Sequence, residues 1–274
     1  MATVTVTRGV RLPEEVAGNR ILMLAALRDV LPPRTVFSDL TAAELHGLWL
    51  PPRPAGGPVH VTVPAEGEPA RQTCPQRLAL RSHRRHLAPS EVGTVAGLPV
   101  TTIARTWRDL AGTLLLPDLV AAGDSALRSG VSAEDLAAAL ATSRGSRGRR
   151  VCRQALPLLC ARSRSRPETH LRVALVTAGL PAPAVNLAIH DDRGQWLAEP
   201  DLAYPAARLA VEYQGLEHAD PERMRRDLAR QLDLHRAGWL VLAYGSPVLR
   251  ACEAVIGDVL AALTDRAPAL LARR

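Results

Sequence analysis

Three carboxylates in the C-terminal half of the chain have the residue type and spacing that could hold a metal ion. Asp201 lies at the end of the apolar stretch 195–203, and Glu212 lies at the end of the next one, 208–213. A turn at 204–207 would fold the two stretches into a hairpin and place both acids side by side. Two carboxylates so near to each other repel, and each loses part of its hydration. A divalent cation bound between them offsets the repulsion and the loss of hydration.

A third acid, Glu168, opens a helix that precedes the hairpin. Oxygen ligands alone favour a hard ion, so these acids predict Mg²⁺ or Mn²⁺ rather than Zn²⁺. An acid in the first turn of a helix is also stabilised by the helix dipole without any metal. Both interpretations of Glu168 stay open at this point.

The elements that must position these acids follow one another in the order α-β-β-β-α-β-α. Ser165 and Pro167 predict the start of the first helix, and Gly179 predicts its end. We expect strands at 185–190, 195–203 and 208–213, a helix at 221–236, a fully buried strand at 239–244 and a last helix at 252–263. The fold class predicted here is α/β with a mixed sheet.

The first half predicts a smaller α+β domain. We expect strands at 3–7, 59–63 and 78–87 and helices at 20–29, 41–47, 101–115, 116–128 and 132–140. Trp107 and Leu110 should point inward. His60, His83 and His86 lie in the expected strands, and with no cysteine close by we interpret them as solvated residues rather than metal ligands.

Charge separates the two halves. Residues 1–164 hold 21 Arg against 13 acidic residues, whereas residues 165–274 hold 13 Arg against 14. No acid occurs between Leu136 and Pro167, where Arg is frequent. We therefore predict domains at 1–160 and 165–274. In the basic segment Arg147, Arg149, Arg150 and Arg153 are candidates for nucleic-acid contact, with a solvated linker as the alternative.

Composition excludes several classes of protein. The four cysteines form no CxxC pair, which argues against a zinc site built on cysteine and against a disulfide framework. No apolar run has the length of a membrane span, and the first residues do not form a signal peptide. The expected location is therefore cytoplasmic, with no membrane partner.

Five phrases of the second half resemble the PD-(D/E)XK nuclease superfamily, in particular its very-short-patch-repair-endonuclease-like branch in actinobacteria. The likeness covers about 110 residues and rests on these phrases in order: SRPETHLR (165–172), AGLPAP (178–183), PDLAYP (200–205), LAVEYQGLEH (209–218) and MRRDLARQLDLHRAGW (224–239). It implies a restriction-endonuclease-like α-β-β-β-α-β core.

The resemblance also implies roles for single residues. Asp201 and Glu212 would bind Mg²⁺ or Mn²⁺ directly, Glu168 would join them, and the carbonyl of Tyr213 would complete the shell. The family usually has Lys at position 214, which steadies the attacking water or the phosphate, and this chain has Gln214. Gln can orient a water molecule but carries no charge.

Two alternatives concern residues near this set. His218 lies five residues beyond the third strand and is either a general base or a loop histidine. Asp227 and Arg230 are expected to be partners on a helix surface, with contact to the acids as the alternative.

The first half is similar to the region that precedes such domains in AbiEi-type antitoxins and related actinobacterial proteins. The phrases are LTAAELHGLWLP (40–51), VHVTVP (59–64) and GLPVTTIARTWRDLA (97–111). Together the two resemblances imply a metal-dependent endonuclease that hydrolyses nucleic acid, with DNA as the expected substrate. The alternative is a non-catalytic DNA-binding regulator or antitoxin with a toxin partner. The intact acids favour the enzyme, and Gln214 favours the alternative.

Overall fold

The computed structural model describes residues 3–7, 10–53, 57–65, 80–141, 148–214, 221–245 and 252–272. The protein is α/β and consists of two compact units, Met1–Pro157 and Leu158–Arg274. The division falls a few residues before the boundary that the sequence predicts. In the described part of the chain no helix has the length and apolar character needed to cross a membrane.

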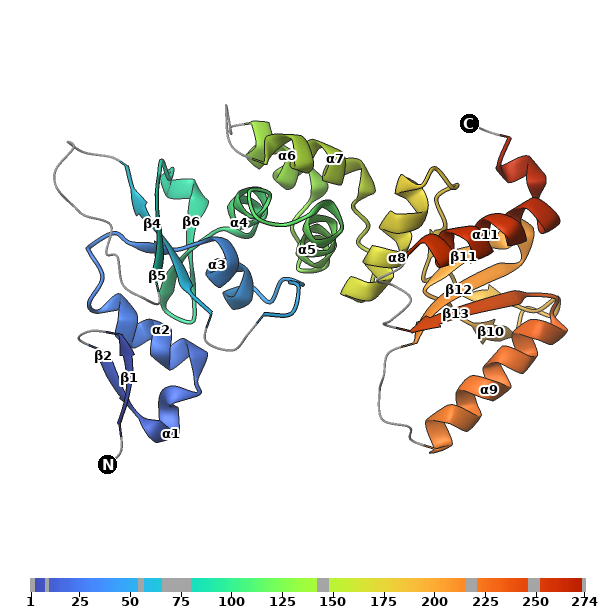
Figure 1. Cartoon of the computed structure of the whole chain (residues 1–274), viewed down its shortest axis with the longest axis horizontal. Coiled ribbons are helices and arrows are strands. Elements are labelled where there is room, and N and C mark those ends of the chain that lie inside the picture. The colour runs from blue at the N-terminus through green and yellow to red at the C-terminus, as the bar shows by residue number, and fades with distance from the viewer. Residues whose placement is uncertain are drawn as a thin grey trace. The chain divides into compact units, whose positions relative to one another are not determined.

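The first unit is built on a five-stranded mixed sheet in the order β5-β4-β3-β7-β6 (Figure 1). Its strands are β3 (Val36–Phe37), β4 (Val59–Pro64), β5 (Leu80–Arg85), β6 (Val92–Val95) and β7 (Leu98–Thr101). β4 runs parallel to β5 and antiparallel to β3, and β6 pairs antiparallel with β7. A separate hairpin joins β1 (Thr3–Thr7) to β2 (Val10–Pro13).

One face of this sheet packs on α2 (Arg20–Arg28), which follows the short α1 (Glu14–Ala17). Leu24 and Leu27 of α2 are buried against Phe37, Val61 and Val100 of the strands. The alternation along β4 turns Val59, Val61 and Val63 toward this core, so His60 and Thr62 face the opposite side. α3 (Asp39–Leu45) follows β3; its Ala42 belongs to the same core as Leu24, and its Thr41 hydroxyl accepts a hydrogen bond from the His60 N–H.

The other regular elements described in the first unit are helical. It contains α4 (Ile103–Leu110), α5 (Leu116–Arg128), α6 (Ala133–Ala141) and α7 (Arg149–Ala155), with 3₁₀ turns at Pro89–Glu91 and Leu156–Leu158. Trp107 and Leu110 are fully buried, as predicted. The Trp107 indole N–H donates to the Leu119 carbonyl at 3.0 Å, which joins α4 to α5.

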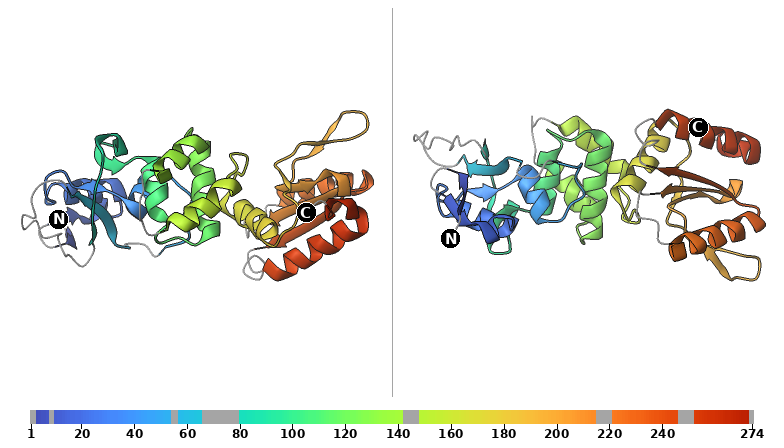
Figure 2. Two further views of the ribbon diagram at one scale, coloured as in Figure 1. Left: turned by 90° about the horizontal axis from the view of Figure 1, so that it is seen from above. Right: turned by 60° about the horizontal axis from the view of Figure 1, so that its bottom comes forward.

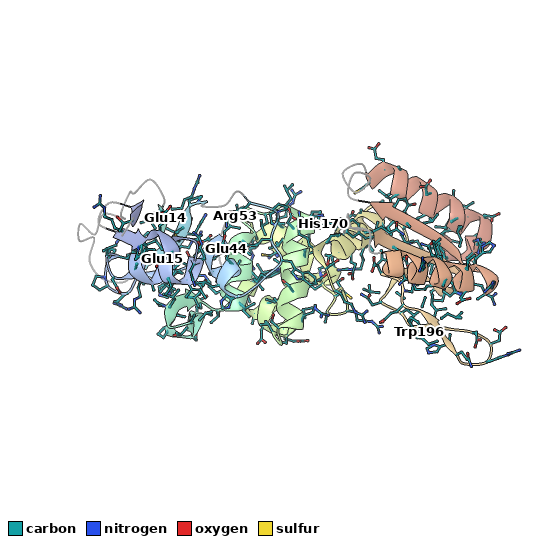
Figure 3. All side chains as sticks on the ribbon, turned by 90° about the horizontal axis from the view of Figure 1, so that it is seen from below. Glu14, Glu15, Glu44, Arg53, His170 and Trp196 are labelled. Atoms are coloured by element: carbon teal, nitrogen blue, oxygen red, sulfur yellow. The ribbon has the colours of Figure 1, made fainter. Side chains whose placement is uncertain are left out.

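The second unit contains a four-stranded sheet in the order β13-β12-β11-β8. Its strands are β8 (Ala184–Val185), β11 (Leu202–Tyr204), β12 (Leu209–Gln214) and β13 (Leu240–Gly245). β11 is antiparallel to β8 and β12, whereas β13 is parallel to β12. A second hairpin, β9 (Ile189–His190) with β10 (Trp196–Ala198), carries the exposed Trp196 labelled in Figure 3.

Helices cover both faces of this sheet, α11 on one and α9 on the other (Figures 1 and 2). The helices are α8 (Arg166–Thr177), α9 (Pro221–Arg236) and α11 (Cys252–Arg266), with 3₁₀ turns at Pro205–Ala207 and Pro268–Leu270. Leu171 of α8 and Val255 of α11 pack on Leu202, Leu209 and Val211 in the main core. Leu234 of α9 packs on Ile189 and Ala198 in a smaller one.

Two of the strands expected in this unit are each broken in two. The stretch 185–190 divides at Asn186, whose φ of 46° lies in the left-handed region and ends β8. The stretch 195–203 divides before Asp201, so β10 and β11 belong to different sheets. β13 is an edge strand that is only partly buried, which corrects the expectation of a fully buried strand.

Candidate functional site

The register of the hairpin in the second unit brings Asp201 and Glu212 together. Leu202 pairs with Val211, so Asp201 and Glu212 occupy the next position of the antiparallel pair. Because β11 begins at Leu202, Asp201 lies just before the strand rather than at its end as the sequence suggested. The Tyr213 N–H donates to Asp201 Oδ2 at 2.7 Å, which fixes the carboxylate beside β12.

Glu168 reaches this place from the first turn of α8. The Ser165 hydroxyl caps the helix by accepting from the Glu168 N–H at 3.3 Å. Glu168 is 7% exposed, and its Oε2 accepts from the Arg164 N–H at 2.8 Å and from the Asn186 amide at 3.0 Å. The Asn186 N–H donates to the Asp201 carbonyl, so one residue links Glu168 to the start of β11.

Burial and neighbouring charges shift the pKa of Asp201. Burial is the main cause that raises it to about 6, and the negative charges of Glu168 and Glu212 raise it further. The hydrogen bond from Tyr213 and the charge of Arg230 act in the opposite direction. Two carboxylates therefore lie near enough to disfavour the charge on the third.

Glu212 is 5% exposed and forms an ion pair with Arg230 of α9, in which the guanidinium lies 3.2 Å from Glu212 Oε2. The helix-surface role expected for Arg230 is therefore wrong, because α9 packs over the face of the sheet that carries Glu212. Gln214 lies two residues further on, on the same face of β12, and is exposed.

The remaining residues of the predicted site are placed as follows. Tyr213 is half-buried beside Glu212, and His218 lies outside the described residues. Arg147 also lies outside them. Arg150 and Arg153 are exposed on α7, whereas Arg149 is half-buried and donates to the Leu140 carbonyl at 2.9 Å.

A second cluster of potential ligands lies in the first unit. Asp39, His60 and His83 each offer one ligand atom, and these three atoms all lie within 4.8 Å of one another. Among the described residues no other three histidine, cysteine or acidic side chains form such a group, and Glu168, Asp201 and Glu212 do not. The cluster opens onto a cavity of about 1800 Å³.

Strand register explains why this cluster forms. His60 pairs with Arg81 across β4 and β5, and His83 pairs with Thr62, so the side chains of His60, Arg81, His83 and Arg85 share one face. Asp39 is 3% exposed at the start of α3 and has a φ of 51°, which is rare for a residue other than glycine. The Arg85 guanidinium holds its carboxylate through two hydrogen bonds, of 2.8 and 3.0 Å.

Charge and burial set the protonation of the cluster. Burial alone would raise the pKa of Asp39, but the hydrogen bonds and charge of Arg85 hold it below its usual value. Burial lowers the pKa of His60 to about 4, and it also lowers that of His83, although the charge of Asp39 opposes both shifts. Asp39 is therefore ionised near neutral pH, and both histidines are neutral.

The sequence interpretation of His60 as a solvated strand residue is wrong, since this side chain is only 6% exposed. β4 is an inner strand between β3 and β5, and the His60 ring stacks on the His83 ring. The sequence predicts no ligand role for Asp39, because the helix expected at 41–47 begins two residues after it, whereas α3 begins at Asp39 with Ser38 as the N-cap residue. Arg81, His83 and Arg85 occupy alternate positions of the strand expected at 78–87, and this spacing is the sequence signal for a shared face.

The chain is similar to known proteins whose function is not described. Two uncharacterized proteins of Mycobacterium tuberculosis, MT2308 of strain CDC 1551 and Rv2248 of strain H37Rv, are each 36% identical to this chain over 150 residues. The match covers 54% of this chain and 55% of each relative, so the chain spans about half the length of the curated relatives it matches. No family model matches, and no solved structure matches.

Proposed function

We propose that the second unit is a metal-dependent nuclease domain that hydrolyses phosphodiester bonds of nucleic acid, with DNA as the expected substrate. One observation carries the proposal. Asp201 and Glu212 lie next to each other at one end of the β11–β12 pair, and Asn186 ties Glu168 to the same end. Acids from a helix and two strands that converge in this way suit a shared cation better than a solvated surface.

The donor set fits a hard divalent ion. Glu168, Asp201, Glu212 and the Tyr213 carbonyl offer only oxygen, which favours Mg²⁺ or Mn²⁺. The hydrogen bonds from Arg164 and Asn186 reach Glu168 Oε2, and that from Tyr213 reaches Asp201 Oδ2, so each of these carboxylates is oriented through one oxygen. Glu212 would exchange its ion pair with Arg230 for the metal ion.

When bound, such an ion polarises the phosphate and lowers the pKa of a water molecule. The residues of the chain have separate tasks. Gln214, on the face of β12 that carries Glu212, orients the attacking water through its amide. Arg230 supplies a guanidinium beside the acids and holds the scissile phosphate, a task that the Lys usual at position 214 shares in the resembled family.

The Arg230–Glu212 ion pair favours a second candidate function. A guanidinium at 3.2 Å already neutralises Glu212 without any metal ion. In that case the unit keeps the fold as a DNA-binding regulator or antitoxin and performs no hydrolysis. Nucleic acid, or a toxin partner, would then bind without being cut.

A cleavage assay separates the two candidates. The purified full chain is incubated with Mg²⁺ or Mn²⁺ and with duplex DNA, single-stranded DNA or RNA, beside Glu212→Gln and the control Asp192→Asn. Asp192 is exposed in the turn between β9 and β10 and lies outside the acid set. For an enzyme we expect Asp192→Asn to cut at the parent rate and Glu212→Gln to lose at least about 100-fold, because metal ligation contributes several kcal/mol.

Gln214→Lys sharpens the test. If Gln214 stands in for an ammonium group, the Lys variant should cut at least as fast as the parent. If neither the parent nor Gln214→Lys cuts any of the three substrates while both bind DNA, the nuclease proposal is wrong and the binding function stands.

A further inference from the structure

The cluster of Asp39, His60 and His83 on the β4–β5 face of the first unit has no role in the nuclease proposal. It combines one carboxylate with two imidazoles, a donor set that binds Zn²⁺, Fe²⁺ and related transition ions in proteins. The oxygen-only set of the second unit prefers a different class of ion. We propose that these three residues form a second, independent metal site that binds a divalent transition-metal ion.

Two of the three distances in the cluster agree with tetrahedral coordination, and the third lies within 4.8 Å. His60 Nδ1 lies 3.2 Å from His83 Nε2, and His83 Nε2 lies 3.5 Å from Asp39 Oδ2. Ligand atoms about 2.0–2.1 Å from a tetrahedral Zn²⁺ are separated from each other by roughly 3.3 Å. An ion can therefore enter this triangle with small side-chain movements.

The contact between the two histidines marks the ring nitrogens that face the site. Imidazole binds a metal ion through a nitrogen that carries no proton. The short distance between His60 Nδ1 and His83 Nε2 is a hydrogen bond, so one of these nitrogens carries a proton. A bound ion takes the place of that proton, which moves to the other nitrogen of the same ring or to solvent.

Arg85 contacts two of the three proposed ligands and can orient them. It donates to both oxygens of Asp39, to Asp109 Oδ2 at 3.0 Å and to His83 Nδ1 at 3.3 Å. For an ion to bind, one Asp39 oxygen must contact both Arg85 and the ion. His83 Nδ1 must also give up its weak hydrogen bond from Arg85 and take a proton. The ion pairs of Arg85 with Asp39 and Asp109 hold the guanidinium in place while this happens.

The remaining coordination position faces the cavity and suits an anion. A divalent ion with one carboxylate and two neutral imidazoles leaves a net charge of +1. Arg53 and Arg81 also line the cavity. An anionic group such as a phosphate is therefore the ligand class expected to complete the site.

Cobalt spectroscopy on the full chain tests the site, with Mg²⁺ in excess to occupy the acids of the second unit. We expect one Co²⁺ per chain, with the visible bands of a four- or five-coordinate ion. His83→Gln should weaken binding by about 100-fold or more, since loss of even an outer-shell partner costs 10- to 100-fold. His86→Gln is the matched control, because His86 is exposed on the same cavity and outside the triangle.

Three further measurements complete the test. Asp201→Asn should bind Co²⁺ as the parent does, which keeps this site distinct from the nuclease proposal. X-ray absorption of the zinc-loaded parent should show two imidazole ligands, a result that needs no variant to fold. Inorganic phosphate should shift the cobalt bands, and unchanged bands would overturn the anion ligand. No stoichiometric binding, equal loss in His83→Gln and His86→Gln, or ligation without imidazole would overturn the site.

Discussion

Asp39 and Asp201 show how neighbours decide the behaviour of one residue type. Both carboxylates are largely removed from water, and burial raises the pKa of each. Asp39 has a guanidinium on both oxygens, and its pKa falls below the usual value. Asp201 has Glu168 and Glu212 close by and one backbone N–H, and its pKa rises to about 6. The fold stabilises the charged form of Asp39 and disfavours the charged form of Asp201.

Asp201 should therefore make stability depend on pH in the metal-free protein. Its folded pKa, about 6, is higher than the ordinary value of 3.8, so the folded state keeps a proton that the unfolded chain has released. Its contribution is favourable below pH 4 and is lost as the pH rises through 6. In EDTA, Asp201→Asn should gain stability relative to the parent between pH 4 and 7, by at most roughly 3 kcal/mol. Denaturant melts at several pH values measure this difference.

The comparison with the parent is needed because His60 titrates in the same window with the opposite sign. Its folded pKa of about 4 lies below the ordinary 6.5, so its contribution is lost as the pH falls. His60 is present in both proteins and cancels in the difference. A difference that does not change from pH 4 to 7 would show that Asp201 has an ordinary pKa.

At the scale of elements, α7 depends on one glycine. Gly148 precedes the helix with a φ of 89°, and a Cβ at this position would lie 2.4 Å from the backbone carbonyl of Ala111, at the end of α4. Only glycine allows both the left-handed backbone and the close approach of the two helices.

Gly148→Ala should therefore destabilise the first unit, by about 2–4 kcal/mol from the strained φ and the steric overlap together. Gly93→Ala is the matched control, because nothing lies within 4 Å of a Cβ built there. Chemical denaturation followed by tryptophan fluorescence, which includes the buried Trp107, measures the effect. Equal midpoints for the two variants would contradict the close approach at Gly148.

The exposed arginines of α7 give a second prediction at this scale. Arg150 and Arg153 are three residues apart and lie on one side of the helix. If each contacts a phosphate, replacing both by Ala should flatten the salt dependence of DNA affinity by up to roughly two units. Arg193→Ala with Arg236→Ala is the control pair, since both are exposed in the second unit. Filter binding at several salt concentrations decides whether α7 is part of the interface.

At the scale of the whole molecule, each unit has its own hydrophobic core. Leu24 belongs to the core of the first unit and Leu209 to that of the second, and both are fully buried. The two units should therefore unfold as separate cooperative transitions.

Hydrogen exchange of the full chain, read by mass spectrometry, tests this independence. Leu24→Ala should reduce protection in residues 3–141 and Leu209→Ala in residues 158–272, each by the equivalent of about 2–5 kcal/mol. Each variant is the control for the other. Loss of protection throughout the chain in either variant would show a single cooperative molecule instead.

The local features of the sequence determined much of the second unit. Ser165, Pro167 and Gly179 set the bounds of α8 because capping and backbone conformation depend on adjacent residues. The turn at 204–207 and the apolar stretches around it predicted the pairing of β11 with β12, and hence Asp201 beside Glu212. The helices expected at 116–128 and 221–236 agree with α5 and α9, and the α/β class followed from the alternation of helices and strands.

Only the tertiary structure decided the partners of these residues. β4 and β5 are parallel, and the register that puts His60 and His83 on one face depends on segments far apart in the chain. Asp39, the first residue of α3, joins them because Arg85 of β5 holds its carboxylate, and Arg230 meets Glu212 because α9 covers the sheet of the second unit. Alternation in a single strand shows which residues share a face, but burial and charge pairing depend on what packs against that face. For this reason the acids could be predicted from the sequence, and the Asp39–His60–His83 cluster could not.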